Sequence, residues 1–434
     1  MPDLMIPNAI LLILLILLAY AWVGYPLILG GLARIARRRP SGSPGSGMPV
    51  QARRVSVILA AYNEEDVIRG RLKNLVAAGG ASAATTSGFN IHLGLDACTD
   101  GTAAIAREFA SSHPFVYVHE FIERRGKAAV LKDLARIAGC GEKRSGGPSA
   151  ARERNEDASH SDFLIFTDAN THFAADAIDR LLGHFDHPEV GGVCGRLVFV
   201  KPGGDMAGPV GQAKADEGFY WEWETRLKTA ESAVDSCLGA NGAIYAIRAS
   251  LFPSDFPDNA VVDDFVIGMK VREQGFRMVY EPEAVAYEEA APEVGDEWVR
   301  RVRIGAGDFQ ALVLCRRCLL PRYGLFAWMF WSHKVLRWLT PHMILLVVGL
   351  AVGGVWTTEG LEMMLSASVL AAMGLFLGLA AVGRMLRGSR GRVLALFRLC
   401  DYFLIMQAAI FAGFLRFCRG GLAGAWTRTA RTRL

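Results

Sequence analysis

The sequence predicts an α/β domain with a mostly parallel, doubly wound sheet, placed between two hydrophobic ends that enter a membrane. Hydrophobic residues make up 52% of the 434 residues and charged residues 21%, against roughly 25% charged in an average soluble protein. The apolar excess is concentrated near the two ends of the chain, and β-rich runs alternate with helical stretches between them. This distribution predicts a membrane protein with one large domain of mixed polarity.

The N-terminal hydrophobic stretch runs from Asn8 to Leu32 without a charged residue. At about 1.5 Å per residue it is long enough to cross about 30 Å of hydrocarbon. A cleaved secretory signal is disfavoured, because Asp3 is the only charge before the stretch and no small-residue cleavage site follows it. We assign residues 1–33 to a transmembrane helix and residues 34–52 to a basic, flexible linker, whose arginines place the following domain in the cytoplasm.

Three more apolar stretches follow the central segment, at about Val335–Trp356, Leu361–Val382 and Val393–Phe417. Each is long enough to cross a bilayer. The loop after the first stretch carries Glu359 and no basic residue, whereas the loop after the second is rich in arginine, so the two loops belong on opposite sides. We assign residues 322–434 to an interfacial helix and a C-terminal region with about three transmembrane helices.

The arginines of the C-terminal tail conflict with a simple count of four membrane crossings. Four crossings from an external N-terminus would leave Arg419, Arg428, Arg431 and Arg433 outside, against the positive-inside rule. Either the last stretch lies along the membrane interface or the tail departs from the rule, and the sequence leaves both open.

Charge and cysteine usage exclude two classes of protein. The 47 Lys and Arg exceed the 43 Asp and Glu by only four, which is too little for a nucleic-acid-binding surface over the whole chain. The eight cysteines are scattered and do not form the framework of a small secreted domain, so we expect them to be reduced.

The central segment, residues 53–321, is predicted to be one α/β domain. The expected strands cover residues 55–62, 91–97, 115–121, 163–169 and 191–200, and the expected helices cover residues 64–78, 102–111, 127–137, 174–185 and 265–274. Such alternation favours a parallel sheet that binds its ligand at the carboxyl ends of the strands.

Polar residues follow three of these strands at the point where each ends. They are Tyr62, Asn63 and Glu64 after the first strand, Asp100 after the second, and Asp168 and Asn170 after the fourth. Each alone is compatible with an ordinary turn or helix cap. Together they predict a crevice with several acidic side chains, whose repulsion a divalent cation or a hydrogen-bonding ligand would offset.

Two further motifs complete the predicted site. Arg124 to Lys127 opens a helix with a cation and a glycine, a combination suited to phosphate. Asp263 and Asp264 stand at the start of the helix 265–274, where they are either capping residues or a general base on a rigid element.

The order of these motifs resembles the membrane-embedded family-2 glycosyltransferases, the group that contains cellulose, hyaluronan and poly-N-acetylglucosamine synthases. The resemblance runs from Val55 to about Leu320 and rests on six motifs: VILAAYNEE, LDACTDGT, RRGKAAVL, FTDAN, SCLGANGAIYAIR and VVDDF. It implies a GT-A domain, which is Rossmann-like, and inverting transfer of a sugar from a nucleotide-diphosphate donor. UDP is the expected nucleotide by this resemblance alone.

The resemblance also implies a role for each matching residue. The implied donor-binding residues are Tyr62, Glu64, Asp96, Asp100, Lys127 and Asp168. The implied ligands of Mg²⁺ or Mn²⁺ are Asp168 and Asn170, and the implied acceptor or phosphate side consists of Gly239, Asn241, Gly242 and Arg303. The implied catalytic base is Asp264, with Asp263 beside it. Implied partners are the donor, a glycan or lipid acceptor and the lipid bilayer, with an accessory subunit left open. The implied location is a bacterial inner membrane, with the catalytic domain in the cytoplasm.

Two positions depart from the family pattern. Asn170 replaces the second aspartate of the metal-binding motif, so we expect weaker metal binding than two carboxylates give. Processive synthases carry an arginine followed by tryptophan, whereas Arg303 is followed by Ile304, which puts processive polymerisation in doubt. Arg300, Arg301 and Arg303 are equally suited to anionic lipid headgroups.

Three functions remain after this reading of the sequence. The leading one is transfer of sugars to a growing surface glycan or exopolysaccharide. The second is transfer of a single sugar to a lipid acceptor, which the loss of the tryptophan favours. The third, of another class, is a catalytically silent membrane module that binds a nucleotide sugar, which Asn170 keeps open.

Overall fold

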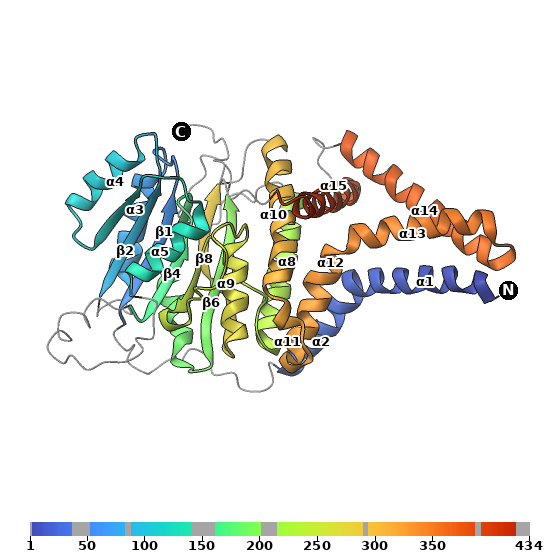
Figure 1. The fold of residues 1–434 in the computed structure, drawn as a ribbon, viewed down its shortest axis with the longest axis horizontal. Helices are drawn as coiled ribbons and strands as arrows, with labels where there is room; N and C mark the ends of the chain where they lie inside the picture. Colours follow the sequence, from blue (N-terminus) through green and yellow to red (C-terminus); the bar gives the residue numbers. More distant parts are fainter. Residues whose placement is uncertain are drawn as a thin grey trace.

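The computed structural model describes residues 2–36, 53–82, 88–139, 161–200, 215–289, 294–386 and 392–421. The molecule is elongated, with the α/β domain at one end and the helices of the hydrophobic stretches at the other (Figure 1). Beyond position 36 the expected linker lies outside the described residues, as do the tail arginines from Arg428 onward.

An eight-stranded sheet forms the centre of the domain, in the order β3-β2-β1-β4-β7-β6-β8-β5. The strands are β1 (Val55–Ala61), β2 (Phe89–Asp96), β3 (Val116–Phe121), β4 (Phe163–Thr167), β5 (Thr171–Phe173), β6 (Val190–Val200), β7 (Tyr245–Arg248) and β8 (Arg277–Glu289). The first four strands of this order pair in parallel, with Val55 opposite Phe89 on β2 and opposite Phe163 on β4. Their carboxyl ends therefore share one edge, as the sequence predicts.

The second half of the sheet is mixed. β7 runs antiparallel to both β4 and β6, β6 and β8 are parallel, and β5 is antiparallel to β8. β5, β7 and β8 are not predicted from the sequence. β5 and β7 are only three and four residues long, and β8 contains Pro282 and several glutamates, which hide its alternation.

Helices cover both faces of the sheet. They are α3 (Ile68–Ala81), α4 (Thr102–Ser111) and α7 (Ala177–Leu182) on one face, and α5 (Lys127–Ile137), α8 (Ala215–Val234) and α9 (Asp263–Glu273) on the other. Alternate residues of β1 serve the two cores: Val57 and Leu59 pack toward α3 and α4, whereas Ile58 and Ala60 pack toward α5 and α9. All seven residues of β1 are buried, which is typical of a central strand covered on both sides.

The hydrophobic ends form long helices that extend away from the domain. They are α1 (Pro2–Ala19), a π-helical turn η1 (Tyr20–Gly24), α2 (Tyr25–Ala36), α13 (Thr340–Thr357), α14 (Gly360–Met385) and α15 (Arg392–Cys418). Four helical stretches are long and apolar enough to cross a membrane, by length and composition: residues 7–36, 340–357, 360–385 and 396–418. One is N-terminal and three are C-terminal, as expected, and the chain is a multi-pass membrane protein.

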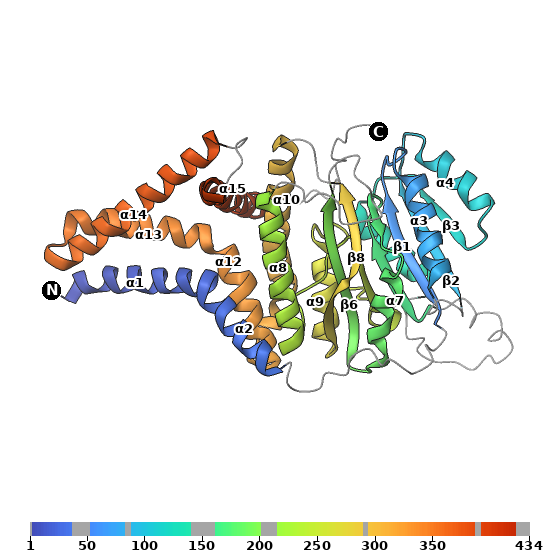
Figure 2. The ribbon, with the colours of Figure 1, turned by 180° about the vertical axis from the view of Figure 1, so that it is seen from behind.

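A layer of helices separates the sheet from the membrane helices. Figure 2 shows α8 and α10 (Val294–Leu314) between the sheet and the long hydrophobic helices, with α2 running obliquely against α8. The short segments α11 (Leu325–Met329), η8 (Phe330–Val335) and α12 (Leu336–Trp338) lead from the domain into α13. They occupy the region that the sequence analysis assigned to an interfacial helix.

A buried polar network joins α2, α8 and η8. His333 is 1% exposed and lies 2.5 Å by its Nδ1 from Glu231 Oε1 and 3.2 Å by its Nε2 from Glu224 Oε2. Tyr25 donates a hydrogen bond to Glu231 at 2.9 Å, and Lys334 donates to Glu224 at 2.8 Å. His333 therefore bridges the two glutamates through both of its ring nitrogens. The network holds the N-terminal membrane helix to the domain.

Candidate active site

The ends of β1 and β2 are tied together by hydrogen bonds around Asp100. Asp100 accepts hydrogen bonds from the backbone N–H and hydroxyl of Thr102 and from the backbone N–H of Glu65. Glu65 in turn accepts the backbone N–H of Gly101 at 2.8 Å. The sequence motif around Asp100 therefore forms a turn that braces the loop after β1, and the buried Glu64 lies within this brace.

Asp96, at the end of β2, holds the loop that precedes Lys127. Its two carboxylate oxygens accept the backbone N–H groups of Arg125 and Gly126, at 2.7 and 2.9 Å. Gly126 has a φ of 86°, a conformation that a residue with a Cβ rarely adopts. Above this loop the guanidinium of Arg124 lies 3.6 Å from the ring centroid of Tyr62. Asp96, Tyr62 and Lys127 are thus brought to one edge of the sheet.

Lys127 connects carboxylates that are far apart in the sequence. Its Nζ lies 2.7 Å from Asp168 Oδ1, after β4, and 4.0 Å from Asp263 Oδ2, at the start of α9. Gly242 borders all of these groups, since a Cβ at its position would lie 3.1 Å from Lys127 Nζ, 3.2 Å from Asp168 Oδ2 and 3.4 Å from Asp264 Oδ2. The structure therefore gathers Lys127, Asp168, Asp263, Asp264 and Gly242 at one point.

The charges at this point set the protonation of each group. Burial opposes the charged form of Lys127, yet the nearby carboxylates of Asp168, Asp263 and Asp264 raise its pKa, so it stays an ammonium. Burial raises the pKa of Asp263 to about 6, against the attraction of Lys127. Burial also raises the pKa of Asp264, which the ammonium of Lys127 and the backbone N–H of Phe265 counteract. Both carboxyl groups therefore titrate above the ordinary range of an aspartate.

The segment from Gly239 to Gly242 lines the side of the site next to α9. Gly239 has a φ of 71°, and a side chain there would collide with the ring of Phe265. Asn241 accepts the backbone N–H of Ile244 and donates to the carbonyl of Gly195 at 2.8 Å, so it braces the loop. Gly242 leaves the room in which Lys127 and the aspartates meet.

Helix α10 closes the site on the side of the membrane helices. A Cβ at Gly307 would lie 2.9 Å from Val261 and 3.1 Å from Val262, the residue just before Asp263. Gln310 accepts the backbone N–H of Val261 at 3.1 Å. About one turn before Gly307, Arg303 lies within electrostatic reach of Asp263 and Asp168, and burial lowers its pKa. Arg303, predicted from the sequence to act on the acceptor or phosphate side, thus faces the aspartate cluster.

The side chain of Asn170 forms its hydrogen bond with a residue outside this cluster. Its amide nitrogen donates to Glu288 Oε1 on β8 at 2.6 Å. Its carbonyl oxygen is the atom that could bind a metal ion, whereas one oxygen of Asp168 is already bonded to Lys127. Among the described residues, no three His, Cys, Asp or Glu side chains form a metal site by themselves.

Three residues near the site were missed from the sequence. The Tyr245 hydroxyl is buried without a hydrogen bond to any described residue, and burial near Asp263 and Asp264 raises its pKa well above the ordinary value. Lys228 on α8 lies within reach of Asp264, and Asp308 on α10 lies within reach of Asp264 and Lys334. Tyr245 follows Gly242 closely enough to be suspected, but no local pattern marks Lys228 or Asp308.

Comparisons with known proteins agree with the motifs and the fold. A family model described as "Glycosyltransferase like family 2" matches residues 52–304. Poly-beta-1,6-N-acetyl-D-glucosamine synthase of Staphylococcus aureus (strain MSSA476) is 22% identical over 298 residues, which are 68% of this chain and 64% of that protein. The chain therefore aligns with less than two thirds of the length of this relative.

A solved structure resembles nearly the whole chain. Mannosyltransferase PcManGT from Pyrobaculum calidifontis, solved in complex with GDP-Man and Mn²⁺, aligns with a TM-score of 0.65 at 21% identity and covers 95% of this chain and 99% of that one. This likeness shows a shared GT-A fold. The chain belongs to the family-2-like glycosyltransferases, and 68% of it aligns with a polysaccharide synthase.

Proposed function

We propose that this protein is an inverting glycosyltransferase that transfers a sugar from a nucleotide-diphosphate donor, with UDP as the expected nucleotide, to a growing surface glycan or exopolysaccharide. The observation that carries the proposal is the meeting of Lys127, Asp168 and the Asp263–Asp264 pair at the carboxyl edge of the sheet. The similarity to a poly-N-acetylglucosamine synthase supports the glycan acceptor. The protein would act from a bacterial inner membrane, with its domain in the cytoplasm.

Asp264 is the general base in this mechanism. The backbone N–H of Phe265 donates to its Oδ1 at 2.8 Å and holds the carboxylate at the first turn of α9. Asp264 takes the proton of an acceptor hydroxyl while that oxygen forms a bond to the anomeric carbon. The bond from this carbon to the donor phosphate breaks on the opposite face, so the configuration inverts and the nucleoside diphosphate leaves.

The neighbouring residues hold the donor in place for this displacement. Lys127 would face the donor phosphates, and Arg303 would add a second cation on the membrane side. Tyr62 and Glu64 would contact the nucleoside, and Asp96 and Asp100 would keep the surrounding loops in position, as their hydrogen bonds suggest. Gly239, Asn241 and Gly242 would border the acceptor.

Asp168 and Asn170 would hold Mg²⁺ or Mn²⁺ with oxygens of the donor diphosphate. Asp263 Oδ2 is buried and has no hydrogen bond to a described residue, and three carboxylates share the ammonium of Lys127 here. This excess of negative charge fits a bound cation. When bound, the metal ion would neutralise the charge that develops on the departing diphosphate. The Mn²⁺ in the solved mannosyltransferase complex is in line with this assignment.

Release of nucleoside diphosphate by the full-length protein in membranes tests the proposal. We would supply UDP-N-acetylglucosamine, then UDP-glucose and GDP-mannose, each with Mg²⁺ or Mn²⁺. We expect release with one donor, and we expect Asp264→Asn to lower turnover by roughly 100-fold or more while donor affinity is kept, because a positioned general base contributes about 10²–10⁴-fold.

Asp258→Asn is the matched control for Asp264→Asn. The Asp258 side chain is 60% exposed and pairs with Lys132, so this variant should turn over at the normal rate. Unchanged turnover in Asp264→Asn would reject Asp264 as the base. No release with any donor would instead favour the silent binding module.

Single-sugar transfer to a lipid acceptor is the second candidate function. Ile304 favours it, because the aromatic ring that processive synthases place after the arginine is absent from this position. Gel analysis of the product formed with labelled donor separates the two functions. A ladder or a long polymer supports glycan extension, whereas one lipid-soluble product of fixed size supports single transfer.

A further inference from the structure

Helix α15 has the length and composition of a membrane span, but its contacts do not fit one. A helix that crossed the bilayer antiparallel to α14 would meet the start of α14 with its own C-terminal half. The N-terminal half of α15 contacts the end of α14, as it would in either orientation: a Cβ at Gly383 would collide with the carbonyl of Phe397. The contacts of the C-terminal half therefore distinguish the two. Phe403 contacts Phe376 of α14 and Trp22 of η1, with ring centroids 5.9 and 5.0 Å apart.

The C-terminal half of α15 contacts α10 and not the far ends of the spans. A Cβ at Gly413 would lie 2.6 Å from the backbone of Gly305 and Ala306. Phe414 packs against Phe309, with ring centroids 5.0 Å apart, and against His342 at 4.5 Å. His342 belongs to the first turn of α13, so this contact also lies at the end of a span that is next to the domain.

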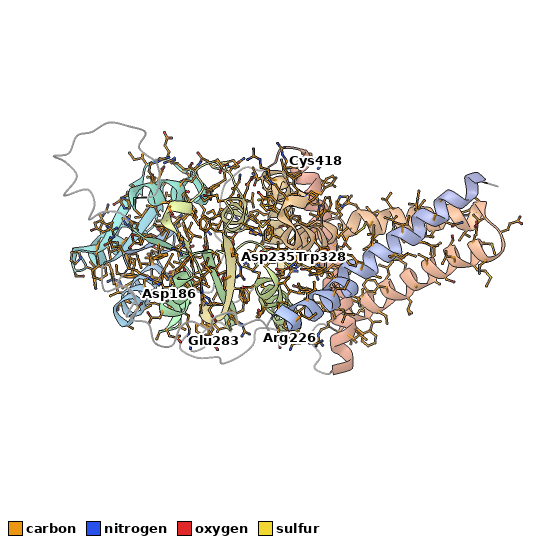
Figure 3. All side chains as sticks on the ribbon, turned by 90° about the horizontal axis from the view of Figure 1, so that it is seen from below. Asp186, Arg226, Asp235, Glu283, Trp328 and Cys418 are labelled. Atoms are coloured by element: carbon orange, nitrogen blue, oxygen red, sulfur yellow. The ribbon has the colours of Figure 1, made fainter. Side chains whose placement is uncertain are left out.

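The figures show the same arrangement. In Figure 1, α1, α13 and α14 extend away from the domain, while α15 is seen almost end-on next to α10. In the view from below, Cys418 at the end of α15 lies beside the domain and far from the outer turns of the spans (Figure 3). The two views together show α15 running across the direction of the other three helices.

We propose that α15 lies in the plane of the membrane surface, on the side of the α/β domain, and that only three of the four apolar stretches cross the bilayer. Its partner is the lipid interface. The exposed side chains Leu396, Leu399 and Leu415 face away from the protein and enter the boundary of the acyl chains. Asp401 and Gln407 are buried against the protein.

This orientation resolves the charge conflict in the sequence. With three crossings, the arginine-rich loop after α14 and Arg419 after α15 lie on the same side as the domain, where anionic headgroups attract them. With four crossings, Arg419 would lie on the opposite side from Arg384. The charge pattern and the helix contacts therefore favour the same topology for independent reasons.

Labelling of cysteines with a membrane-impermeant maleimide in intact and disrupted bacterial cells tests the proposal on the full-length protein. Peptide mass spectrometry reads four sites: native Cys418, Met385→Cys at the end of α14, Glu359→Cys between α13 and α14, and Ser111→Cys on the domain. We expect Cys418 and Met385→Cys to be labelled under the same conditions as Ser111→Cys on the domain. Glu359→Cys should be labelled under the other conditions, because it lies on the opposite side of the membrane. Labelling of Cys418 together with Glu359→Cys would overturn the proposal.

A depth measurement tests the same orientation without reference to sides. Spin labels would be placed at Leu396→Cys and Leu415→Cys, one per protein, after Cys98, Cys140, Cys400 and Cys418 are replaced by serine. A crossing helix would separate the two labels by about 28 Å in depth, at about 1.5 Å for each of the intervening residues. We expect nearly equal depths in vesicles with anionic lipid, and a difference of the crossing size would contradict the proposal. Labels at Leu345 and Val352 of α13 serve as the crossing control.

Discussion

At the scale of single residues, the ammonium of Lys127 compensates the negative charges of the aspartates in the site. Its ammonium lies 2.7 Å from Asp168 and 4.0 Å from Asp263, and its side chain is only 21% exposed. Removing one partner of a buried ion pair is strongly destabilising, because the charge that remains is uncompensated. Lys127 therefore has a structural role as well as its proposed role at the donor phosphates.

Lys127→Met should abolish donor binding and lower the melting temperature of the purified protein. Breaking a buried pair in this way costs about 3–5 kcal/mol, and Asp168, Asp263 and Asp264 would repel one another without the ammonium. Thermal unfolding and donor titration measure the two effects. Lys132→Met, on the same helix α5, is the control, since its partner Asp258 is 60% exposed. Normal donor affinity in Lys127→Met would remove Lys127 from the phosphate site.

Asp308 gives the protein a pH-dependent stability. Burial raises its pKa to about 7 against the attraction of Lys334, and the charges of Asp264 and Glu224 add to the rise. An unfolded aspartate has a pKa of about 3.9, so between these values the folded protein holds a proton that the unfolded chain has lost. The free energy of unfolding contributed by Asp308 therefore falls as the pH rises from about 4 to 7.

Asp308→Asn should flatten this pH dependence. The amide cannot ionise, so the variant should gain in melting temperature relative to the unmodified protein at pH 8 and differ least at pH 5. Melting curves of the two proteins at pH 5, 6, 7 and 8 in the same detergent measure the slope. Parallel slopes would show that Asp308 does not carry the effect.

At the scale of elements, two glycines let α10 connect a membrane-surface helix to the catalytic loop. Gly305 faces α15, where a Cβ would lie 3.1 Å from Ile410, and Gly307 faces the loop before α9, at 2.9 Å from Val261. Positions two apart lie on nearly opposite faces of a helix. Helix α10 therefore packs closely against α15 on one face and against the loop before Asp263 on the other.

Gly413→Ala should lower the turnover number more than donor affinity. The added Cβ would lie 2.6 Å from the backbone of α10, and overpacking of this kind costs about 1–3 kcal/mol and shifts the backbone. Gly378→Ala on α14 is the control, since nothing lies within 4 Å of its Cβ position. Steady-state kinetics with varied donor separate the two quantities. Equal turnover in both variants would show that α15 does not set the position of the base.

The elements also show where sequence reasoning succeeds. The parallel strands β1, β2 and β4 are largely buried hydrophobic runs between clear breaks, so their pattern predicts them within a few residues. The edge strand β3 is mostly not buried, and its β-branched and aromatic residues predict it. β7 and β8 were missed because they take part in a mixed sheet whose pairing is non-local: β7 becomes a strand only between β4 and β6. The residues of a strand do not by themselves predict which distant strands it will pair with.

At the scale of the whole molecule, charge is divided between two regions. Acidic side chains gather with Lys127 at the carboxyl edge of the sheet, and arginines flank the membrane helices. Between them, α8 and α10 form the layer that seats the domain on the membrane (Figure 2). The buried hydrogen bonds among Tyr25, Glu231 and His333 hold α2 to the domain, because losing one member would leave buried polar groups unsatisfied.

The sequence by itself determined the class of the domain, its glycosyltransferase motifs and the presence of membrane helices. Each of these is a local property: hydrophobic run length, strand periodicity, or the spacing of residues in a motif. Only the tertiary structure decided that Lys127 joins Asp168 and Asp263, and that Lys228, Tyr245 and Asp308 lie near Asp264. It also supplied the contacts that support the orientation proposed for α15, since a helix has the same composition whether it crosses a bilayer or lies on it.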